Sequence, residues 1–417
     1  MPGQTVKPQV AIVGGGMITA IQLLPTIYYL QRMGLVGPIS VAALNAAAIR
    51  KLMDDPTLKA GFPSQSFNAY PKPDGPSQDM SELYREMIAD LPPRQIVVAA
   101  VPDHLHYQVI RSALEHDQHV LSVKPLVLKY AQALEIEQEA FRRGLMVGAE
   151  YHKRFDYRSL MARREYRAGR FGQFRAGQAH LVECWYYRHS NFQNWCTVEN
   201  SDMFTYIGCH YVDLVAFITG LLPVSVSLYG VVEDYPNGRK GYLWTDGRVK
   251  WNNGAFLSVL TGLGYPDAAP GGNTQGLTMH CEGDKDGCLI RHSDQFRGVE
   301  HSYRAAGGEP GDTVYAQPNP DYFRMLDMGE GCLTPVGYGH RSVEYIINAA
   351  RRIESQAGGD LAARQRMLRE MDQAGIMATP ANSSYNELVI EAGRLSIANN
   401  GREAVIEYGQ KPSVHLA

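Results

Sequence analysis

The sequence predicts an α/β protein with a doubly wound parallel sheet in its N-terminal part. An α+β domain with a large open, mainly antiparallel sheet is expected to follow. Three observations carry this prediction. The apolar run Val10 to Val13 leads into a glycine cluster and then into a helix-like apolar pattern. Strand-like and helix-like stretches alternate up to Gly148. Beyond it, stretches of alternating polarity are separated by turn sequences, as in antiparallel sheets.

Composition narrows the classes of protein. With 417 residues the chain is too long for one core, and we expect two domains, residues 1–149 and 150–417, with C-terminal helices packing back on the first. A net charge of −3 argues against a nucleic-acid partner. No leader sequence and no membrane-spanning run is seen. The six cysteines include no C-x-x-C pair, which favours a cytoplasmic protein with reduced thiols and no metal site.

The glycine cluster after the first strand matches part of a dinucleotide-binding pattern. Gly14 and Gly16 occupy the first two positions of G-x-G-x-x-G, and Thr19 stands at the third. Such a turn exposes backbone N–H groups and a helix N-terminus to a pyrophosphate. We therefore predict that Gly14, Gly16, Met17 and Ile18 contact a cofactor. A purely structural turn is the alternative.

The second strand, expected over residues 39–44, ends at Asn45. An acidic residue at that tip usually accepts hydrogen bonds from the adenosine ribose. Asn45 can still bind the ribose but lacks the charge that repels a 2′-phosphate. Because three alanines and no basic residue follow, NAD is the predicted cofactor and NADP is not excluded. Alternatively, Asn45 only caps the next helix.

The remaining elements follow in order. Residues 56–80, rich in Pro, Gly, Ser and Asn, are expected to form an irregular loop. The rest of the first domain is expected to consist of a helix at 81–89, a strand at 95–101, a helix that opens at 101–106 and runs through 114, a strand at 119–123, a helix at 131–144 and a strand at 145–148.

The second domain reads as a sheet with one covered and one free face. Its strands are expected at 174–187, 224–232, 255–263, 277–281 and 288–291, with turns at Asp246-Gly247 and 284–287. Helices are expected at 159–168, 339–354 and 388–400, and 355–384 reads as a polar surface insertion.

Several motifs together resemble those of one family. V-P-D-H-L-H at 101–106 and H-V-L-S-V-K-P-L at 119–126 are similar to a paired signature of the glucose–fructose oxidoreductase, inositol dehydrogenase and rhizopine-catabolism family. The frame G-x-H-x-x-D at 208–213, the pair at 154–155 and the pattern at 392–405 also match, so the resemblance covers most of the chain. It implies a bound nicotinamide cofactor with Val101, Pro102, His106 and Lys124 among its contacts, and a homo-oligomer (dimer or tetramer) formed through the open sheet.

The resemblance also assigns catalytic roles. Lys124 follows a parallel strand at the sheet edge where ligands bind, and is expected to touch the nicotinamide ribose and the reacting hydroxyl. His210 is the predicted base, since histidine titrates nearest neutral pH, although a core histidine is the alternative. Asp213 lies one helical turn further on and is predicted to hold the imidazole, contact the substrate or pair with a cation.

Two positions depart from the family pattern. Val123 replaces a glutamate, and Tyr206 stands where inositol-dehydrogenase-like members carry an aspartate. The expected catalytic trio is therefore Lys124, Tyr206 and His210. A phenol is uncharged near neutral pH, so the substrate need not be inositol or glucose. Our hypothesis is that Tyr206 shapes the pocket and hydrogen-bonds a substrate hydroxyl.

A polar and aromatic set completes the predicted site. Tyr151, His152, Arg154 and Tyr338 combine ring faces with hydrogen-bonding groups, which suits a carbohydrate or cyclitol substrate. We predict an NAD(P)-dependent dehydrogenase that oxidises a secondary hydroxyl of a sugar, glycoside or cyclitol. One alternative is a redox-neutral enzyme that recycles tightly bound NAD and cleaves a glycoside through a transient ketone. A non-catalytic binding protein on the same fold is the other.

Overall fold

The computed structural model describes residues 7–75, 77–269, 271–283, 286–293, 301–304, 313–316 and 321–417. Its internal contacts divide the chain into two compact units. The first comprises residues 1–155 and 322–384, and the second comprises residues 156–321 and 385–417. The chain thus returns to the first unit after the segment that contributes most of the second.

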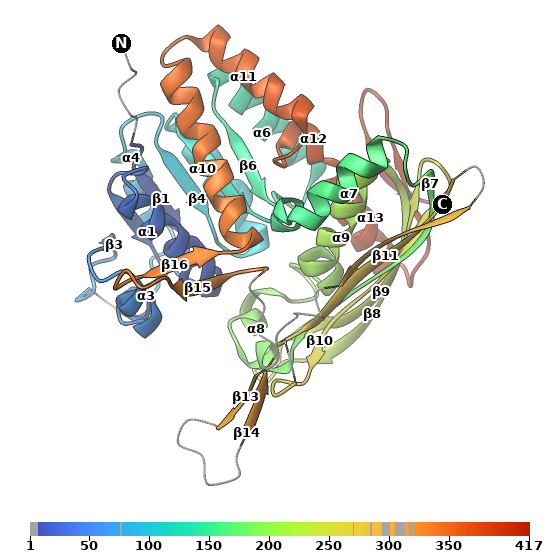
Figure 1. Cartoon of the computed structure of the whole chain (residues 1–417), viewed down its shortest axis with the longest axis horizontal. Coiled ribbons are helices and arrows are strands. Elements are labelled where there is room, and N and C mark those ends of the chain that lie inside the picture. Colours follow the sequence, from blue (N-terminus) through green and yellow to red (C-terminus); the bar gives the residue numbers. More distant parts are fainter. Residues whose placement is uncertain are drawn as a thin grey trace. The chain divides into compact units, whose positions relative to one another are not determined.

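The first unit is built on a six-stranded parallel sheet with the order β3-β2-β1-β4-β5-β6 (Figure 1). Its strands are β1 (Val10–Val13), β2 (Ile39–Ala42), β3 (Asn68–Tyr70), β4 (Ile96–Ala99), β5 (His119–Val123) and β6 (Val147–Glu150). Every residue of β1 and β4 is buried, as expected for central strands covered on both faces. The predicted doubly wound parallel sheet is confirmed.

Helices and a small hairpin complete this unit. The longer helices are α1 (Leu24–Arg32), α2 (Ala46–Met53), α3 (Pro56–Gly61), α4 (Leu83–Ala89), α5 (His106–Glu115), α6 (Tyr130–Arg143), α10 (Tyr338–Gln356), α11 (Leu361–Ala374) and α12 (Pro380–Ser383). Shorter helical turns are η1 (Thr19–Leu23), η2 (Asp103–Leu105) and η3 (His152–Phe155), and β15 (Arg324–Asp327) pairs with β16 (Leu333–Val336). Apolar residues such as Ile27, Val343 and Ile347 join α1 and α10 in one core with β1.

Two sequence-based expectations for this unit were wrong. Residues 56–80 are not wholly irregular: Asp55 caps α3, and β3 adds a parallel edge strand beside β2. Residues 355–384 are not a surface insertion, since they form α11 and α12. Asp360 caps α11. Although the sequence of α11 is mostly polar, one face of this helix is buried and includes Arg364 and Leu368.

The second unit contains an eight-stranded sheet with the order β12-β11-β7-β10-β9-β8-β17-β18. The strands are β7 (Gln173–Cys184), β8 (Pro223–Asp234), β9 (Lys240–Trp251), β10 (Phe256–Tyr265), β11 (Thr274–Glu282), β12 (Gly287–Ser293), β17 (Ala404–Glu407) and β18 (Ser413–Leu416). Only the pairing of β7 with β10 is parallel. The predicted large, mainly antiparallel sheet is confirmed. A further antiparallel pair is formed by β13 (His301–Arg304) and β14 (Thr313–Ala316).

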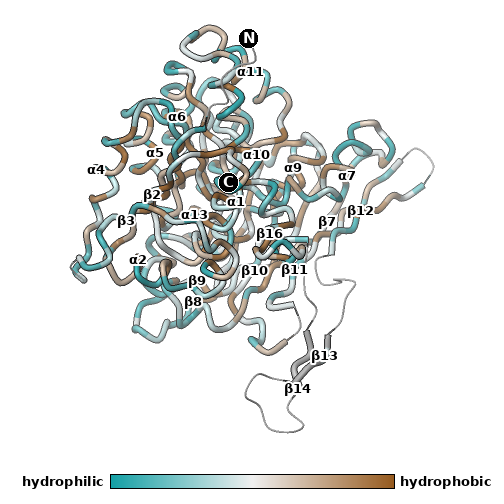
Figure 2. The backbone as a smooth tube through the Cα atoms, turned by 60° about the vertical axis from the view of Figure 1, so that its left-hand side comes forward, coloured by the Kyte–Doolittle hydropathy of each residue, from teal (hydrophilic) through white to brown (hydrophobic). Residues whose placement is uncertain are grey.

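Helices cover part of this sheet. They are α7 (Tyr157–Arg167), η4 (Trp185–His189), α8 (Phe192–Trp195), η5 (Phe204–Gly208), α9 (Cys209–Thr219) and α13 (Tyr385–Ile397). All residues of α9 from Cys209 to Ile218 are buried, and Figure 2 colours this region largely as hydrophobic. Apolar side chains on several strands remain exposed, among them Tyr229, Val231, Phe256, Leu260 and Leu289.

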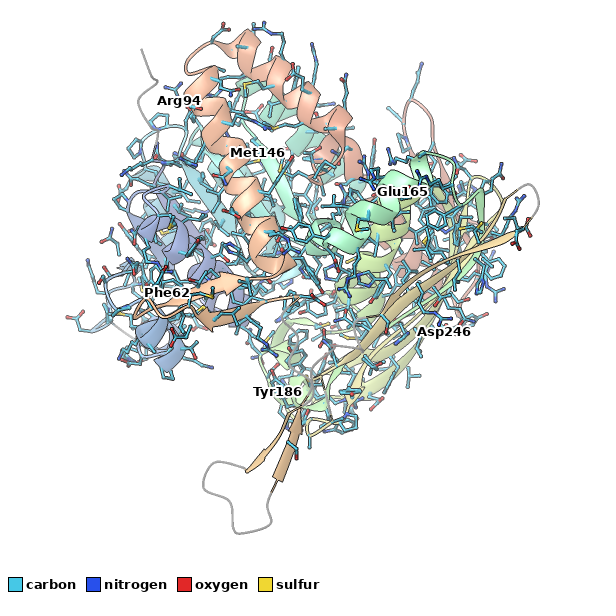
Figure 3. The ribbon with its side chains drawn as sticks, in the orientation of Figure 1. Phe62, Arg94, Met146, Glu165, Tyr186 and Asp246 are labelled. Atoms are coloured by element: carbon cyan, nitrogen blue, oxygen red, sulfur yellow. The ribbon has the colours of Figure 1, made fainter. Side chains whose placement is uncertain are left out.

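The turn expected at Asp246-Gly247 was wrong. Both residues lie inside β9, where Gly247 pairs with Leu228 on one side and Val259 on the other, and Figure 3 shows Asp246 within the sheet. A Cβ atom at Gly247 would lie 2.9 Å from Cδ1 of Leu228, so close packing and not a turn accounts for this glycine. The turn expected at 284–287 lies partly outside the described residues.

None of the helices in the described part of the chain is long and apolar enough to cross a membrane.

Candidate active site and its cofactor domain

The glycine turn joins β1 to the helical segment η1. Gly14 has φ +118°, and a Cβ atom there would lie 2.0 Å from the carbonyl oxygen of Ala100. Only glycine fits this close approach to the end of β4. A Cβ atom on Gly16 would meet nothing within 4 Å, and Gly16 is exposed. The turn therefore combines tight packing against the sheet with open space above its second glycine, as a dinucleotide pyrophosphate requires.

Thr19 replaces the third glycine of the pattern. Its side chain is completely buried, and Oγ1 donates a hydrogen bond of 2.6 Å to the carbonyl oxygen of Gly14. Of the other two predicted cofactor contacts, Met17 is exposed and Ile18 is half-buried. The residues of this turn fit a bound dinucleotide.

Asn45 stands at the N-terminus of α2 directly beyond β2. Its Oδ1 accepts a hydrogen bond of 3.1 Å from the backbone of Ala48, so the capping role considered from the sequence is present. Its Nδ2 donates to Oδ1 of Asp79 at 2.9 Å. Asp79 belongs to the stretch expected to be an irregular loop, and sequence reasoning did not select it.

His106 connects the exits of two neighbouring strands. Nδ1 lies 2.7 Å from the carbonyl oxygen of Pro125, and Nε2 lies 2.8 Å from that of Val101. The ring is completely buried, so it aligns the backbone of these two segments. Pro102, like Val101, is half-buried.

Lys124 follows β5 at the carboxyl edge of the sheet and is half-buried. The carbonyl oxygen bound by His106 belongs to Pro125, the residue immediately after this lysine. The predicted cofactor residues Gly14, Val101 and Lys124 thus all come from loops at the carboxyl edge of β1, β4 and β5. This is where open parallel sheets bind their ligands.

A second polar group lies at the end of β6 and was not selected from the sequence. Glu150 is buried and accepts hydrogen bonds from Gln22 Nε2 at 2.9 Å and from the hydroxyl of Ser342. Nδ1 of His152 donates to Oε2 of the same carboxylate at 3.2 Å. Tyr322 in turn donates to Gln22 Oε1 at 2.5 Å. Glu150 therefore holds His152 in one orientation and one tautomer.

Four predicted substrate residues lie near Glu150. Three of them follow it closely in the sequence, and the fourth, Tyr338, contacts His152. The His152 ring stacks on Tyr338, with centroids 5.5 Å apart and an angle of 29° between the planes. The Arg154 guanidinium lies 5.9 Å from the ring centroid of Tyr151. Tyr151, Arg154 and Tyr338 are each at most 2% exposed, whereas His152 is half-buried. His152 is consequently the most accessible of the four.

In the second unit, the predicted catalytic residues share one helical run. Tyr206 lies in η5, and its ring contacts Phe192 edge-on at 4.8 Å and Trp195 at 5.6 Å. His210 lies in the first turn of α9 and is 4% exposed. This places Tyr206 one helical turn before His210, as the spacing predicted.

Asp213 lies three residues after His210 on the same helix, α9. It is 1% exposed, and its Oδ1 accepts hydrogen bonds of 2.9 Å from Tyr385 Oη and Asn386 Nδ2. These bonds join α9 to α13. The geometry supports a role in fixing the helix that carries His210 rather than a direct contact with substrate.

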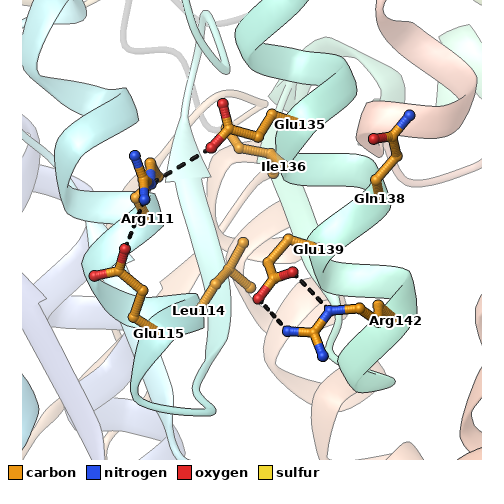
Figure 4. Close-up of a pocket in the computed structure, with 8 residues that line it drawn as sticks. All are labelled: Arg111, Leu114, Glu115, Glu135, Ile136, Gln138, Glu139 and Arg142. Atoms are coloured by element: carbon orange, nitrogen blue, oxygen red, sulfur yellow. Dashed lines mark hydrogen bonds and ion pairs between the residues drawn. The ribbon is translucent and has the colours of Figure 1, made fainter.

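A surface hollow between α5 and α6 contains none of the predicted residues (Figure 4). It is lined by Arg111, Leu114, Glu115, Glu135, Ile136, Gln138, Glu139 and Arg142. Arg111 lies 2.8 Å from Glu115 and 3.5 Å from Glu135, and Arg142 lies 2.6 Å from Glu139. The charged groups of the lining are thus engaged in ion pairs with one another, and its three carboxylates outnumber its two guanidinium groups.

The N-terminal part of the chain is similar to known oxidoreductases. Residues 9–151 match the model of an oxidoreductase family with an NAD-binding Rossmann fold. An uncharacterized oxidoreductase of Schizosaccharomyces pombe is 29% identical over 128 residues, which cover 30% of this chain and 34% of that protein. The uncharacterized oxidoreductase YfiI of Bacillus subtilis is 36% identical over 72 residues, 16% of this chain and 18% of the relative. The chain thus matches about a third or less of the length of these relatives.

Solved structures resemble this one over nearly their whole length. GenD2 from gentamicin A biosynthesis, in complex with NAD, has a TM-score of 0.66 and 16% identity, and the match covers 98% of this chain and 99% of GenD2. Scyllo-inositol dehydrogenase from Lactobacillus casei, with NAD(H) and scyllo-inositol, has a TM-score of 0.61 and 14% identity, covering 96% and 99%. At such identities the likeness establishes the fold.

Residues 9–151 therefore match the NAD-binding Rossmann domain of this oxidoreductase family.

Proposed function

We propose that the protein is an NAD-dependent oxidoreductase that oxidises a secondary hydroxyl of a sugar, glycoside or cyclitol. The observation that carries the proposal is the family's NAD-binding domain with Lys124 at the carboxyl edge of its sheet. Scyllo-inositol dehydrogenase, solved with scyllo-inositol, supports the substrate class, since it shares the fold over 96% of the chain. The proposed cofactor is NAD and not NADP.

The reaction needs a hydride acceptor, a base and a group that steadies the oxygen. When bound, NAD would supply the acceptor for the hydride on the carbon that carries the hydroxyl. In the proposal His210 takes the hydroxyl proton at Nε2, because its Nδ1 is a buried atom. Lys124 donates a hydrogen bond to the same oxygen and orients it. With one hydride and one proton removed, the secondary alcohol becomes a ketone.

The substrate is held by the remaining predicted residues. His152, oriented by Glu150 and stacked on Tyr338, provides a polar edge for a hydroxyl. Tyr206 provides a phenolic hydroxyl, and its ring packs against the ring of Phe192. Tyr151, Arg154 and Asp213 are buried, and we assign them to positioning the residues beside them.

A redox-neutral reaction is the second candidate. Tyr206, in an aromatic cluster with Phe192 and Trp195, stands where the inositol-dehydrogenase pattern has an aspartate. In such an enzyme the ketone acidifies the neighbouring C–H, a leaving group departs by elimination, and the hydride then returns to the carbon. A non-catalytic binding protein is the third candidate, and the presence of both Lys124 and His210 argues against it.

The proposal includes a cytoplasmic homo-oligomer, a dimer or a tetramer. The apolar side chains exposed on the sheet of the second unit, such as Val231 and Leu260, are 55% and 45% exposed. Burying such a face between two copies would remove this apolar surface from water.

The test is an absorbance scan of the purified protein near the reduced-nicotinamide band, repeated with a panel of pyranosides and inositols, with and without NAD. A band that grows with NAD and one class of sugar supports the dehydrogenase. A band already stoichiometric with protein, together with sugar consumption but no released NADH, supports the redox-neutral reaction. Absence of turnover with every sugar contradicts both.

A further inference from the structure

The tip of β2 carries a carboxylate that comes from a distant part of the chain. Asp79 lies 34 residues after Asn45, and the two side chains are joined by the hydrogen bond from Asn45 Nδ2 to Asp79 Oδ1. The backbone N–H of Met80 donates to the carbonyl oxygen of Leu44 at 2.7 Å. These two hydrogen bonds, made by the consecutive residues Asp79 and Met80, therefore hold Asp79 beside Leu44 and Asn45, directly after β2.

The segment before Asp79 is also attached to α2. Arg50 donates from its guanidinium to the carbonyl oxygen of Pro73 at 2.5 Å. Arg50 is the first basic residue after the strand tip, because Ala46, Ala47 and Ala48 come before the apolar Ile49. This hydrogen bond engages part of the Arg50 guanidinium, which would otherwise be available to bind the 2′-phosphate of NADP.

Asp79 presents a net negative charge to solvent. The side chain is exposed, and it forms no ion pair with a residue in the described ranges. The Asn45 amide that holds it is neutral, so the carboxylate keeps its full charge. Asn45 cannot supply that charge itself, and its own oxygen is used to cap α2.

We infer that Asp79 is the residue that selects NAD over NADP. In dinucleotide-binding domains a carboxylate at the tip of this strand accepts hydrogen bonds from the adenosine ribose. The same charge repels the phosphate that NADP carries on the ribose 2′-oxygen. Asn45 is a positioning residue in this arrangement, since it orients one oxygen of Asp79 and leaves the other to a ligand. The inference rests on the proposed use of a nicotinamide dinucleotide and adds its specificity.

The experiment measures binding and not turnover. The full-length protein is titrated with NADH and with NADPH, and the dissociation constants are read from nicotinamide fluorescence. The wild type is expected to prefer NADH. Asp79→Asn keeps the shape of the side chain but removes its charge, and it is expected to lower the preference for NADH about tenfold or more, by weakening NADH binding and strengthening NADPH binding.

A matched control and a second variant separate charge from structure. Asp90→Asn removes a carboxylate that is also exposed. It lies at the C-terminal end of α4, before β4 begins and so at the opposite edge of the sheet, and its loss should leave the preference unchanged. Asn45→Ser keeps an oxygen that caps α2 but is too short to reach Asp79. It should lower the preference without a loss of folding. High salt should narrow the wild-type preference, because the repulsion is between exposed charges.

The outcomes are distinguishable. If Asp79→Asn binds NADH and keeps the wild-type preference, the assignment of Asp79 is overturned and the proposed function stands. If the wild type prefers NADPH, the assignment is likewise overturned. If the wild type binds neither nucleotide, the proposed function falls together with the inference.

Discussion

The hydroxyl of Thr19 donates a hydrogen bond of 2.6 Å to the carbonyl oxygen of Gly14, five residues earlier in the chain. This bond closes the turn between β1 and η1, and the Thr19 side chain that makes it is completely buried. The third glycine of the dinucleotide pattern is usually needed for close packing of helix and strand. Here a threonine occupies that position and uses its side chain to hold the turn in shape.

Thr19→Val should therefore weaken both folding and cofactor binding. Valine has the same shape but cannot donate, so the carbonyl of Gly14 loses a hydrogen bond worth about 1 kcal/mol. We expect a lower urea midpoint and weaker NADH binding in a fluorescence titration. Thr19→Ser keeps the hydroxyl and should bind NADH as the wild type does. Equal binding by the valine and serine variants would show that the bond does not shape the site.

His210→Asn should reduce kcat/KM for the sugar about 10²- to 10⁴-fold, since it removes the proposed base. The dissociation constant of NADH should stay within about twofold of the wild type, because proton transfer is not part of cofactor binding. His280→Asn, on an exposed position of β11, is the matched control and should retain activity. Retained turnover in His210→Asn would contradict the assignment of the base.

Tyr206→Phe tests the residue that departs from the family pattern. The phenylalanine ring can keep the contacts with Phe192 and Trp195, so only the hydroxyl is lost. We expect KM for the sugar to rise about five- to tenfold, the loss of one hydrogen bond of about 1 kcal/mol, with little change in NADH binding. Tyr229→Phe, on the exposed sheet face, serves as the control. Unchanged turnover and unchanged KM in Tyr206→Phe would contradict the hypothesis.

The parallel sheet could be predicted because its strands are short apolar runs between glycine-rich or polar exits. β3 and α3 escaped prediction for the opposite reason. A three-residue edge strand and a six-residue helix leave little periodic signal, and the Pro and Gly around them resemble a loop. In β9 the pair Asp246-Gly247 has the composition of a hairpin turn, although Gly247 is required by the nearby Leu228 side chain.

The candidate site residues were selected from the sequence only where a motif marked them. Lys124 and His210 stand in recognisable frames, and Gly14 stands in a strand–turn–helix pattern. Glu150 does not: its partners Gln22 and Ser342 are 128 and 192 residues away in the sequence. Asp79 is likewise defined by its contact with Asn45 and not by its neighbours in the chain. Such contacts depend on tertiary packing, which no local pattern records.

A buried histidine makes stability depend on pH. His119 is completely buried, its Nδ1 accepts a hydrogen bond from the N–H of Met146, and its Nε2 donates to Glu354 at 2.7 Å. The ring must therefore be neutral. Burial lowers the pKa of His119, and this outweighs the opposing effect of Glu354. Burial alone would raise the pKa of Glu354, but the bond from His119 and the charge of Arg364 lower it.

Both shifts act in the same direction. In each case the folded protein binds the proton less readily than the unfolded chain, so the stabilisation is complete above the unfolded pKa of about 6.5 for histidine and about 4.3 for glutamate, and is lost as the pH falls. We expect the urea midpoint to decline as the pH is lowered from 7 to 5, because the unfolded chain binds a proton at His119 more readily than the folded protein does. His119→Gln should be less stable than the wild type by about 1–3 kcal/mol at pH 8, because the bonds to Met146 and Glu354 are imperfectly replaced. Its midpoint should change less between pH 7 and 5, since the titrating ring is gone. A variant with the same pH dependence as the wild type would place the acid-sensitive group elsewhere.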